Sequence, residues 1–407
     1  MTAVLRARIN AYPRQFWLMF FGMTISTIGA SMIWPFLMIY ASERLNQPLT
    51  LLASLLTLNS AMGLISSLIA GPVIDRFGRK WVMVVSLLIH GMAYFGLGRA
   101  STLPSFALLM AVGGAFNPLY RVGADAMMAD LVPPHKRTDA YSLLRFSNNA
   151  GVAIGPAVGG FIATVSYNLA FYFASAGLMI YGLLLAVFSI ETLPVLTPEF
   201  EIKRQKERFG GYLDIIKDGH FMAFIGVFIL VTISATLVWL LLGVYAKNYY
   251  GVSESLYGWI PTTNALMVVF FQLSITRITR RYPPLSMLAI GALFYALAVG
   301  GIAFTSGFWG FWVCMIILTI GELILAPTST TYAANLAPVD MRGRYMGIYG
   351  LTWGIAAGTG PVFGGVLSDT LSPKAPWIGG SVIGLVSAAL FLILSRRKAS
   401  GSFEAAP

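Results

Sequence analysis

Gly71-Pro72-Val73-Ile74-Asp75-Arg76-Phe77-Gly78-Arg79-Lys80 forms a short polar turn between two long apolar runs, 51–74 and 81–99. Gly78 permits a tight turn because it lacks a Cβ atom, and Gly71 allows a neighbouring helix to approach closely. Asp75 closes the first run. Its carboxylate can accept hydrogen bonds from a nearby helix N-terminus, where the helix dipole favours negative charge. The turn therefore indicates two helices joined by a charged tip.

The composition around this turn is that of a membrane protein. Hydrophobic residues make up 57% of the 407 residues and charged residues 11%, against about 45–50% and about 25% in a typical globular chain. With one cysteine, Cys314, and three histidines, the chain offers no disulfide scaffold and no Cys/His zinc site. We therefore expect neither a metal nor a cofactor.

The apolar runs have the length of membrane-spanning helices. Crossing the hydrocarbon takes roughly 20 residues at about 1.5 Å per residue. The short alternating segments of a membrane β-barrel are absent from the sequence. Twelve spans are predicted: 16–40, 51–74, 81–99, 104–130, 139–165, 168–190, 221–246, 256–276, 284–305, 308–334, 345–368 and 376–395.

The basic residues predict the orientation of these spans. The net charge is +11, with 27 lysines and arginines. Most of them lie in the N-terminal tail and in alternate loops, and the opposite loops hold only Arg44, Arg99, Lys247 and Lys374. Positive charge favours the cytoplasmic side. We therefore expect a cell-membrane protein with both termini in the cytoplasm, and no nucleic-acid partner.

The chain also repeats itself at a spacing of about 205 residues. Ala129-Asp130-Leu131-Val132-Pro133 matches Ala334-Asn335-Leu336-Ala337-Pro338, and Gly155-Pro156-Ala157-Val158-Gly159-Gly160 matches Gly360-Pro361-Val362-Phe363-Gly364-Gly365. The repeat predicts two six-helix bundles, 1–190 and 220–407, joined by a cytoplasmic linker, 191–219. Transporters built this way bind substrate near the midplane between bundles that rock to expose it to each side in turn.

Asp130, at the end of the fourth span, is placed to pair with Arg76 or Arg79 in the polar turn. Such a cluster would latch one side of a rocking transporter shut. The alternative interpretation is ordinary anchoring at the membrane interface. The predicted gate comprises Gly71, Asp75, Arg76, Gly78, Arg79, Lys80 and Asp130.

These residues resemble the G-x-x-x-D-R-x-G-R-K loop signature of the major facilitator superfamily. Gly151-Val152-Ala153-Ile154-Gly155-Pro156-Ala157-Val158-Gly159-Gly160 is similar to G-x-x-x-G-P-x-x-G-G, the fifth-span signature of that superfamily's proton-coupled drug antiporters. The resemblance covers about 16–395. It implies an all-α fold of twelve helices in two pseudo-symmetric bundles, and a gating role for Asp75, Arg76, Arg79 and Asp130.

One family feature is missing. The antiporters usually carry an R-x-x-Q-G pattern in the first half of the fourth span, where this chain has Met110-Ala111-Val112-Gly113-Gly114. Arg121 lies three turns further on, so the family's assignment of a proton-handling arginine does not transfer to it.

The fifth-span motif also has a meaning of its own. Gly151, Gly155 and Gly159 recur every four residues and form a smooth helix face for close packing, while Pro156 bends the helix. Gly160 completes the motif. A packing hinge without any role in specificity is the alternative.

Charged residues within predicted spans are costly and therefore candidates for function. Glu322 has no basic residue within a turn of it in the sequence, and removal from water favours the neutral form of a carboxyl group. We predict proton coupling by Glu322, Asp125 and Arg121. A protonated packing role for Glu322, and structural neutralisation among Arg121, Asp125 and Arg145, are the alternatives. His90 is interpreted as a satisfied interior histidine.

The first and seventh spans should line the cavity by the architecture that the resemblance implies. Their aromatic and methionine-rich walls suit varied apolar shapes rather than one polar solute. The predicted cavity residues are Thr27, Ser31, Trp34, Asn117, Arg145, Thr236, Trp239 and Asn264.

Together these features predict a transporter, not an enzyme, that exports lipophilic or drug-like small molecules in exchange for protons. Its expected partners are that small-molecule substrate, protons and membrane lipids, and it is expected to work as a monomer. A proton-coupled metabolite importer, a lipid translocator and a non-transporting receptor or scaffold remain open. An ATP-driven pump is disfavoured because no G-x-x-x-x-G-K-[ST] loop occurs.

Overall fold

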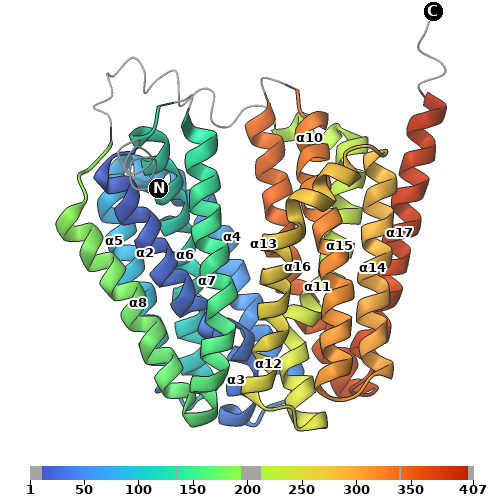
Figure 1. The fold of residues 1–407 in the computed structure, drawn as a ribbon, viewed down its shortest axis with the longest axis horizontal. Coiled ribbons are helices and arrows are strands. Elements are labelled where there is room, and N and C mark those ends of the chain that lie inside the picture. Colours follow the sequence, from blue (N-terminus) through green and yellow to red (C-terminus); the bar gives the residue numbers. More distant parts are fainter. Residues whose placement is uncertain (1–11, 134–135, 194–211, 339–340, 402–407) are drawn as a thin grey trace, which may run out of the picture. The chain divides into compact units, whose positions relative to one another are not determined.

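The computed structural model describes residues 12–133, 136–193, 212–338 and 341–401, and within these ranges every regular element is helical (Figure 1). The elements are α2 (Arg14–Ile33), η1 (Trp34–Phe36), α3 (Leu37–Leu45), α4 (Leu49–Phe77), α5 (Arg79–Leu97), α6 (Leu103–Leu131), α7 (Arg137–Val165), α8 (Tyr167–Phe188), α10 (Tyr212–Lys217), α11 (Gly219–Tyr250), α12 (Glu254–Tyr257), α13 (Trp259–Thr279), α14 (Pro284–Phe304), α15 (Gly307–Leu336), α16 (Arg342–Thr370) and α17 (Ala375–Gly401). Most of the linker predicted at 191–219 lies outside the described residues.

Ten of the described segments are long and apolar enough to cross a membrane. The other two predicted spans correspond to α7 and α16, which are 29 residues each. Length therefore allows them to cross as well. They are less apolar because they carry more polar residues and glycines, including Asn148 and Asn149 in α7.

The ends of the helices follow local chemistry. Thr102 caps α6 through a reciprocal pair of contacts with Ser105. Gly251 ends α11 in the left-handed conformation, at φ 63°. The first predicted span, 16–40, is not one regular helix. Pro35 lies in a 3₁₀ turn, Trp34–Phe36, that separates α2 from α3, because proline removes a backbone hydrogen bond within a helix.

The chain forms two compact units. Unit 1 comprises the described residues of Met1–Asn46, Leu58–Pro194 and Ser253–Ala265, and unit 2 comprises those of Gln47–Thr57, Val195–Val252 and Leu266–Pro407. Two short segments thus group with the half of the sequence to which they do not belong. Residues 253–265 pack within unit 1, and residues 47–57 pack within unit 2.

Helix packing inside the two units follows one pattern. In unit 1, α2 packs on α7 and α8, while α5 packs on α6 and α8. In unit 2, α11 packs on α16 and α17, while α14 packs on α15 and α17. The same neighbours therefore recur in the same chain order, as the internal sequence repeat predicts.

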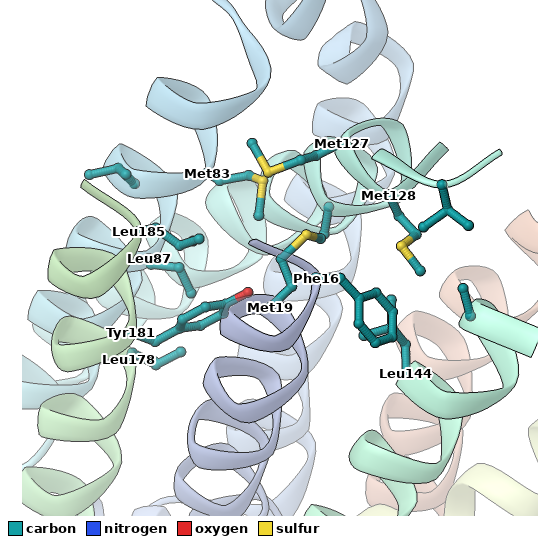
Figure 2. Packing of buried hydrophobic residues seen from close by; sticks show 14 residues of the cluster. Phe16, Met19, Met83, Leu87, Met127, Met128, Leu144, Leu178, Tyr181 and Leu185 are labelled. Carbon is teal, nitrogen blue, oxygen red and sulfur yellow. The ribbon is translucent and has the colours of Figure 1, made fainter. Parts of the chain in front are cut away.

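A methionine-rich core holds unit 1 together near the start of α2 (Figure 2). It draws side chains from α2, α5, α6, α7 and α8. Methionine fills irregular gaps well because its side chain is unbranched and flexible. The residues at its centre are Phe16, Met19, Met83, Leu87, Met127, Met128, Leu144, Leu178, Tyr181 and Leu185.

Candidate functional site

The polar turn predicted from the sequence joins α4 to α5 at Gly78. This residue has φ 89°, a conformation that favours glycine. A Cβ atom built on Gly78 would lie 2.8 Å from the carboxyl carbon of Glu191. The backbone conformation therefore favours glycine at this position, and a side chain here would also displace the Glu191 carboxylate.

Arg79 begins α5 and pairs with Asp130 at the end of α6. The Nε atom of Arg79 lies 3.0 Å from Oδ2 of Asp130, and the Arg79 side chain is only 7% exposed. The Thr192 hydroxyl also donates to Asp130, at 3.0 Å. The pairing of Asp130 with an arginine of the turn is thus present, while its role as a gate stays a prediction.

Glu191 completes this cluster, and its role was not predicted from the sequence. Its two carboxylate oxygens accept hydrogen bonds from the backbone N–H groups of Arg79 at 2.9 Å and Lys80 at 3.1 Å. A carboxylate is favourable at a helix N-terminus because the dipole is positive there. The available signal was an acidic residue directly after the sixth apolar run. From the sequence, Glu191 was expected only to begin the linker.

The remaining predicted gate residues lie around this cluster. Gly71 and Asp75 are half-buried near the end of α4. The guanidinium of exposed Arg76 lies 5.5 Å from the ring centre of Phe77, and the ammonium of Lys80 lies 5.0 Å from that of Trp81. These two basic side chains therefore rest on aromatic rings and do not take part in the Arg79–Asp130 ion pair.

The glycines of the fifth-span motif form the contact face of α7. A Cβ atom at Gly155 would lie 2.8 Å from the carbonyl oxygen of Ile28, and one at Gly151 would lie 2.7 Å from Cβ of Thr27. Gly159 approaches the backbone of Met32 in the same way. The stripe therefore packs against α2.

The other end of the motif faces residues 253–265. A Cβ atom at Gly160 would lie 2.5 Å from the carbonyl oxygen of Glu254, and one at Gly258 would lie 3.1 Å from the carbonyl carbon of Pro156. Glu254 is buried and accepts a short hydrogen bond from the Tyr167 hydroxyl. This contact explains why the segment groups with unit 1.

Several predicted cavity residues make helix-to-helix contacts. Ser31 donates to the carbonyl oxygen of Gly151 at 3.0 Å, and Thr27 donates to Oδ1 of Asn148 at 3.2 Å. Thr236 is buried and donates to the carbonyl oxygen of Ala356 at 3.3 Å. These three hydroxyls therefore serve helix packing, and a further role in the cavity stays a prediction.

The other predicted cavity residues differ in exposure. Trp34 is 38% exposed in the turn after α2, Trp239 is half-buried in α11, and Asn264 is buried in α13. Their convergence on one substrate stays a prediction.

A strip of exposed polar side chains runs along α6 and α7 in unit 1. Asn117, Arg121 and Asp125 follow one another every four residues along α6, so they share a face. On α7, Tyr141, Arg145 and Asn148 are likewise exposed. The Tyr141 hydroxyl donates to the backbone oxygen of Asp125 at 3.2 Å and links the two helices. We call these six residues the polar strip.

Glu322 lies on α15, which packs against α14. Gly321 makes the close approach: a Cβ atom there would lie 2.7 Å from the Tyr295 ring and 2.8 Å from the carbonyl oxygen of Gly291. Glu322 is half-buried and acts electrostatically on the buried Tyr295. The acid predicted for proton coupling is thus removed from full solvent contact.

The repeated helix order agrees with a match to a known protein family. The model of the Major Facilitator Superfamily matches residues 19–242 and 224–407. This chain belongs to the Major Facilitator Superfamily. Membership makes it a membrane transporter rather than an enzyme. The two matches, which overlap at residues 224–242, reflect the internal repeat.

Among curated relatives in this superfamily, a Na⁺, Li⁺, K⁺/H⁺ antiporter of Planococcus maritimus is 28% identical over 86% of both chains. Multidrug resistance protein 1 of Bacillus subtilis is 27% identical over 75% of this chain and 77% of its own. Multidrug resistance protein MdtH of Escherichia coli O1:K1 is 25% identical over 77% of this chain and 78% of its own.

Solved structures show the same fold. The peptide transporter POT in complex with sulfate superimposes with a TM-score of 0.78, at 17% identity over 95% of both chains. The nucleoside transporter NupG superimposes with a TM-score of 0.79, at 12% identity over 93% of this chain and 99% of its own. At these identities the likeness shows the superfamily fold alone.

Proposed function

We propose that this transporter exports lipophilic, drug-like molecules across the cell membrane in exchange for protons. The observation that carries the proposal is the polar strip: Arg121, Asp125 and Arg145 are exposed on helices long enough to cross the membrane. Charged side chains facing lipid are costly, so such side chains usually line a water-filled path. A path lined in this way suits a transporter with an open internal cavity.

Proton coupling is assigned to Glu322 in unit 2 and to Asp125 and Arg121 in unit 1. Glu322 is half-buried on α15 beside Tyr295. Carboxyl groups within transporter helices serve as proton relays, so this one would bind a proton from one side of the membrane. Release of the proton to the opposite side would then return the transporter to its starting state.

Gating is assigned to the cluster of Arg79, Asp130 and Glu191. Arg79 is buried, and its side chain is held by one carboxylate while a second carboxylate caps its helix. Such a cluster would act as a gate by having two states, one in which these contacts are formed and one in which they are broken. We place it on the cytoplasmic side, with both termini, because basic residues gather at this end of the helices.

The export direction is supported by relatives whose names describe multidrug resistance. The glycine stripe of α7 supports it as well, through its resemblance to the antiporter signature. A metabolite importer, a lipid translocator and a receptor that binds without transport are the alternative functions for this fold. An alkali-cation/proton antiporter is a further alternative, favoured by the relative from Planococcus maritimus.

The test is a flux assay in inverted membrane vesicles that contain the protein. With a proton gradient, vesicles should accumulate a neutral lipophilic dye, and collapse of the gradient should stop accumulation. Glu322→Gln should reduce gradient-driven uptake by at least tenfold, while Glu322→Asp should retain part of it. Proton-coupled export would be excluded if dye uptake were the same with and without the gradient and the same in Glu322→Gln as in the wild type.

The same vesicles separate the alternatives. A metabolite importer would move no dye and would accumulate its solute with the proton gradient in right-side-out liposomes. A lipid translocator would scramble fluorescent lipids, and a receptor would bind ligand without flux. An alkali-cation antiporter would release protons on addition of Na⁺ or K⁺ without any dye.

A further inference from the structure

The polar strip carries an excess of positive charge. Arg121 and Asp125 lie four residues apart on α6 and interact electrostatically, so each offsets the charge of the other. Arg145 on α7 has no such partner: among the described residues, none lies within ion-pair or hydrogen-bond distance of its guanidinium. One exposed cation on the strip is therefore left uncompensated.

Arg145 lies well inside its helix. It follows the start of α7 by eight residues, about 12 Å at 1.5 Å per residue. Arg121 precedes the end of α6 by ten residues, about 15 Å on the same basis. The two guanidinium groups thus reach comparable depths within helices that cross a hydrocarbon layer of about 30 Å. At such a depth an uncompensated cation is costly unless it faces water or an anion.

Asn148 adds hydrogen-bond donors beside Arg145. It lies three residues further along α7, on the same face of the helix. Its Oδ1 atom already accepts a hydrogen bond from Thr27 at 3.2 Å. The amide NH₂ group, which is a donor only, is therefore left for another group. Arg145 and the Asn148 amide together present hydrogen-bond donors and one positive charge.

We propose that the exported compounds are amphipathic organic anions whose carboxylate, sulfonate or phosphate group binds Arg145 and Asn148. The fork of N–H donors on arginine matches the paired oxygens of such groups. This inference rests on the proposed export function and adds the charge of the substrate to it. A lipophilic cation would instead meet the unpaired positive charge of Arg145, which opposes its binding.

Three compounds that share one fluorophore test the charge preference: N-dansylglycine, which is an anion, its neutral methyl ester, and a dansyl alkylamine, which is a cation. Binding to purified protein in detergent is measured by dansyl fluorescence, and uptake is measured in the inverted vesicles. We expect the anion to bind at least tenfold more tightly than the ester and to be taken up faster than the other two.

The variants assign that preference to Arg145. Arg145→Gln should make the affinities for the anion and the ester equal, Arg145→Lys should keep most of the difference, and Asn148→Ala should reduce it. Arg280→Gln removes an exposed arginine at the end of α13 and serves as the matched control. Because Arg145 is exposed, thermal melting of the Arg145 variants should remain close to that of the wild type.

Three outcomes would overturn the inference: equal or tighter binding of the ester or the amine, an anion preference that survives Arg145→Gln, or no binding of any dansyl compound. Failure of export itself is a separate result, seen as the absence of gradient-driven uptake of the neutral lipophilic dye. If the neutral dye is taken up but the anion binds no more tightly than the ester, the proposed export function stands and only the preference for anions is excluded.

Discussion

The hydroxyl of Ser31 donates a hydrogen bond to the carbonyl oxygen of Gly151 at 3.0 Å and so ties α2 to α7. The same bond occurs in the other unit, where Thr236 donates to the carbonyl oxygen of Ala356 at 3.3 Å. Both bonds join residues 120 positions apart in the chain. The sequence repeat therefore extends to a single hydrogen bond, which the equivalent helices make within each unit.

Replacement of Gly155 by alanine should destabilise the α2–α7 pair. The new Cβ atom would lie 2.8 Å from the carbonyl oxygen of Ile28 and would overlap the Ser31 side chain. Overpacking of this kind costs about 1–3 kcal/mol. We expect a lower melting temperature of the purified protein in detergent. Gly226→Ala is the matched control, since nothing lies within 4 Å of a Cβ atom at that helical position. Equal melting temperatures for the two variants would contradict the packing argument.

Replacement of Asp130 by asparagine should leave Arg79 buried without its carboxylate. Loss of one partner of a buried ion pair costs several kcal/mol. Because the Asp130 side chain is 27% exposed, water screens part of this cost, and we expect about 1–3 kcal/mol.

A double-mutant cycle measures the interaction itself. Arg79→Gln combined with Asp130→Asn should cost less than the sum of the two single changes, because the double variant leaves no unpaired charge. Melting of the four proteins in one detergent provides the energies. Strict additivity would show that the ion pair seen in the structure contributes nothing to stability.

Replacement of Glu191 by alanine should weaken the start of α5. The change removes the acceptor for the backbone N–H groups of Arg79 and Lys80, and loss of a helix cap costs about 1 kcal/mol. Glu191→Gln keeps one side-chain oxygen and should cost less. Hydrogen exchange at the first turn of α5 should accelerate in the alanine variant. Unchanged exchange there would contradict the role of Glu191 as the cap of α5.

Asp369 should hold the start of α4 within unit 2. Its carboxylate accepts from the backbone N–H and hydroxyl of Thr50 at 2.8 and 2.7 Å, and from the N–H of Leu49 at 3.3 Å. Asp369→Asn should therefore speed hydrogen exchange in residues 49–53. Exchange in residues 254–258 should not change, because that segment packs on Gly160 in unit 1 instead. Faster exchange in both segments would point to a general loosening of the protein.

Much of the fold could be predicted because each membrane-spanning helix is marked by its own run of apolar residues. Runs of apolar residues predict helices one at a time, and the repeat around Gly155 and Gly360 predicts equivalent partners. The pairing of Asp130 with either Arg76 or Arg79 was predicted from the alternation of helix ends, and the structure shows Arg79 as the partner. Prediction was less complete at Pro35, where a 3₁₀ turn divides the predicted span 16–40 into two helices.

Other parts of the site could not be predicted. Ser31 and Thr236 were predicted to line a substrate cavity because they lie in the first and seventh spans, which line it in the architecture that the resemblance implies. In the structure their hydroxyls bind backbone oxygens of neighbouring helices. A hydroxyl in a membrane helix satisfies either role, and the sequence contains nothing that separates a packing contact from a ligand contact.

The amino-acid sequence by itself determined the helices, their repeated order and the concentration of basic residues at one end of them, because these depend on hydrophobicity and periodicity along the chain. Only the tertiary structure decided that Glu191 caps a helix 112 residues away. It also decided that residues 47–57, from the first half of the sequence, pack in unit 2, and that residues 253–265, from the second half, pack in unit 1. Such contacts depend on which surfaces meet when the helices pack, and the order of residues along a helix does not specify its neighbours.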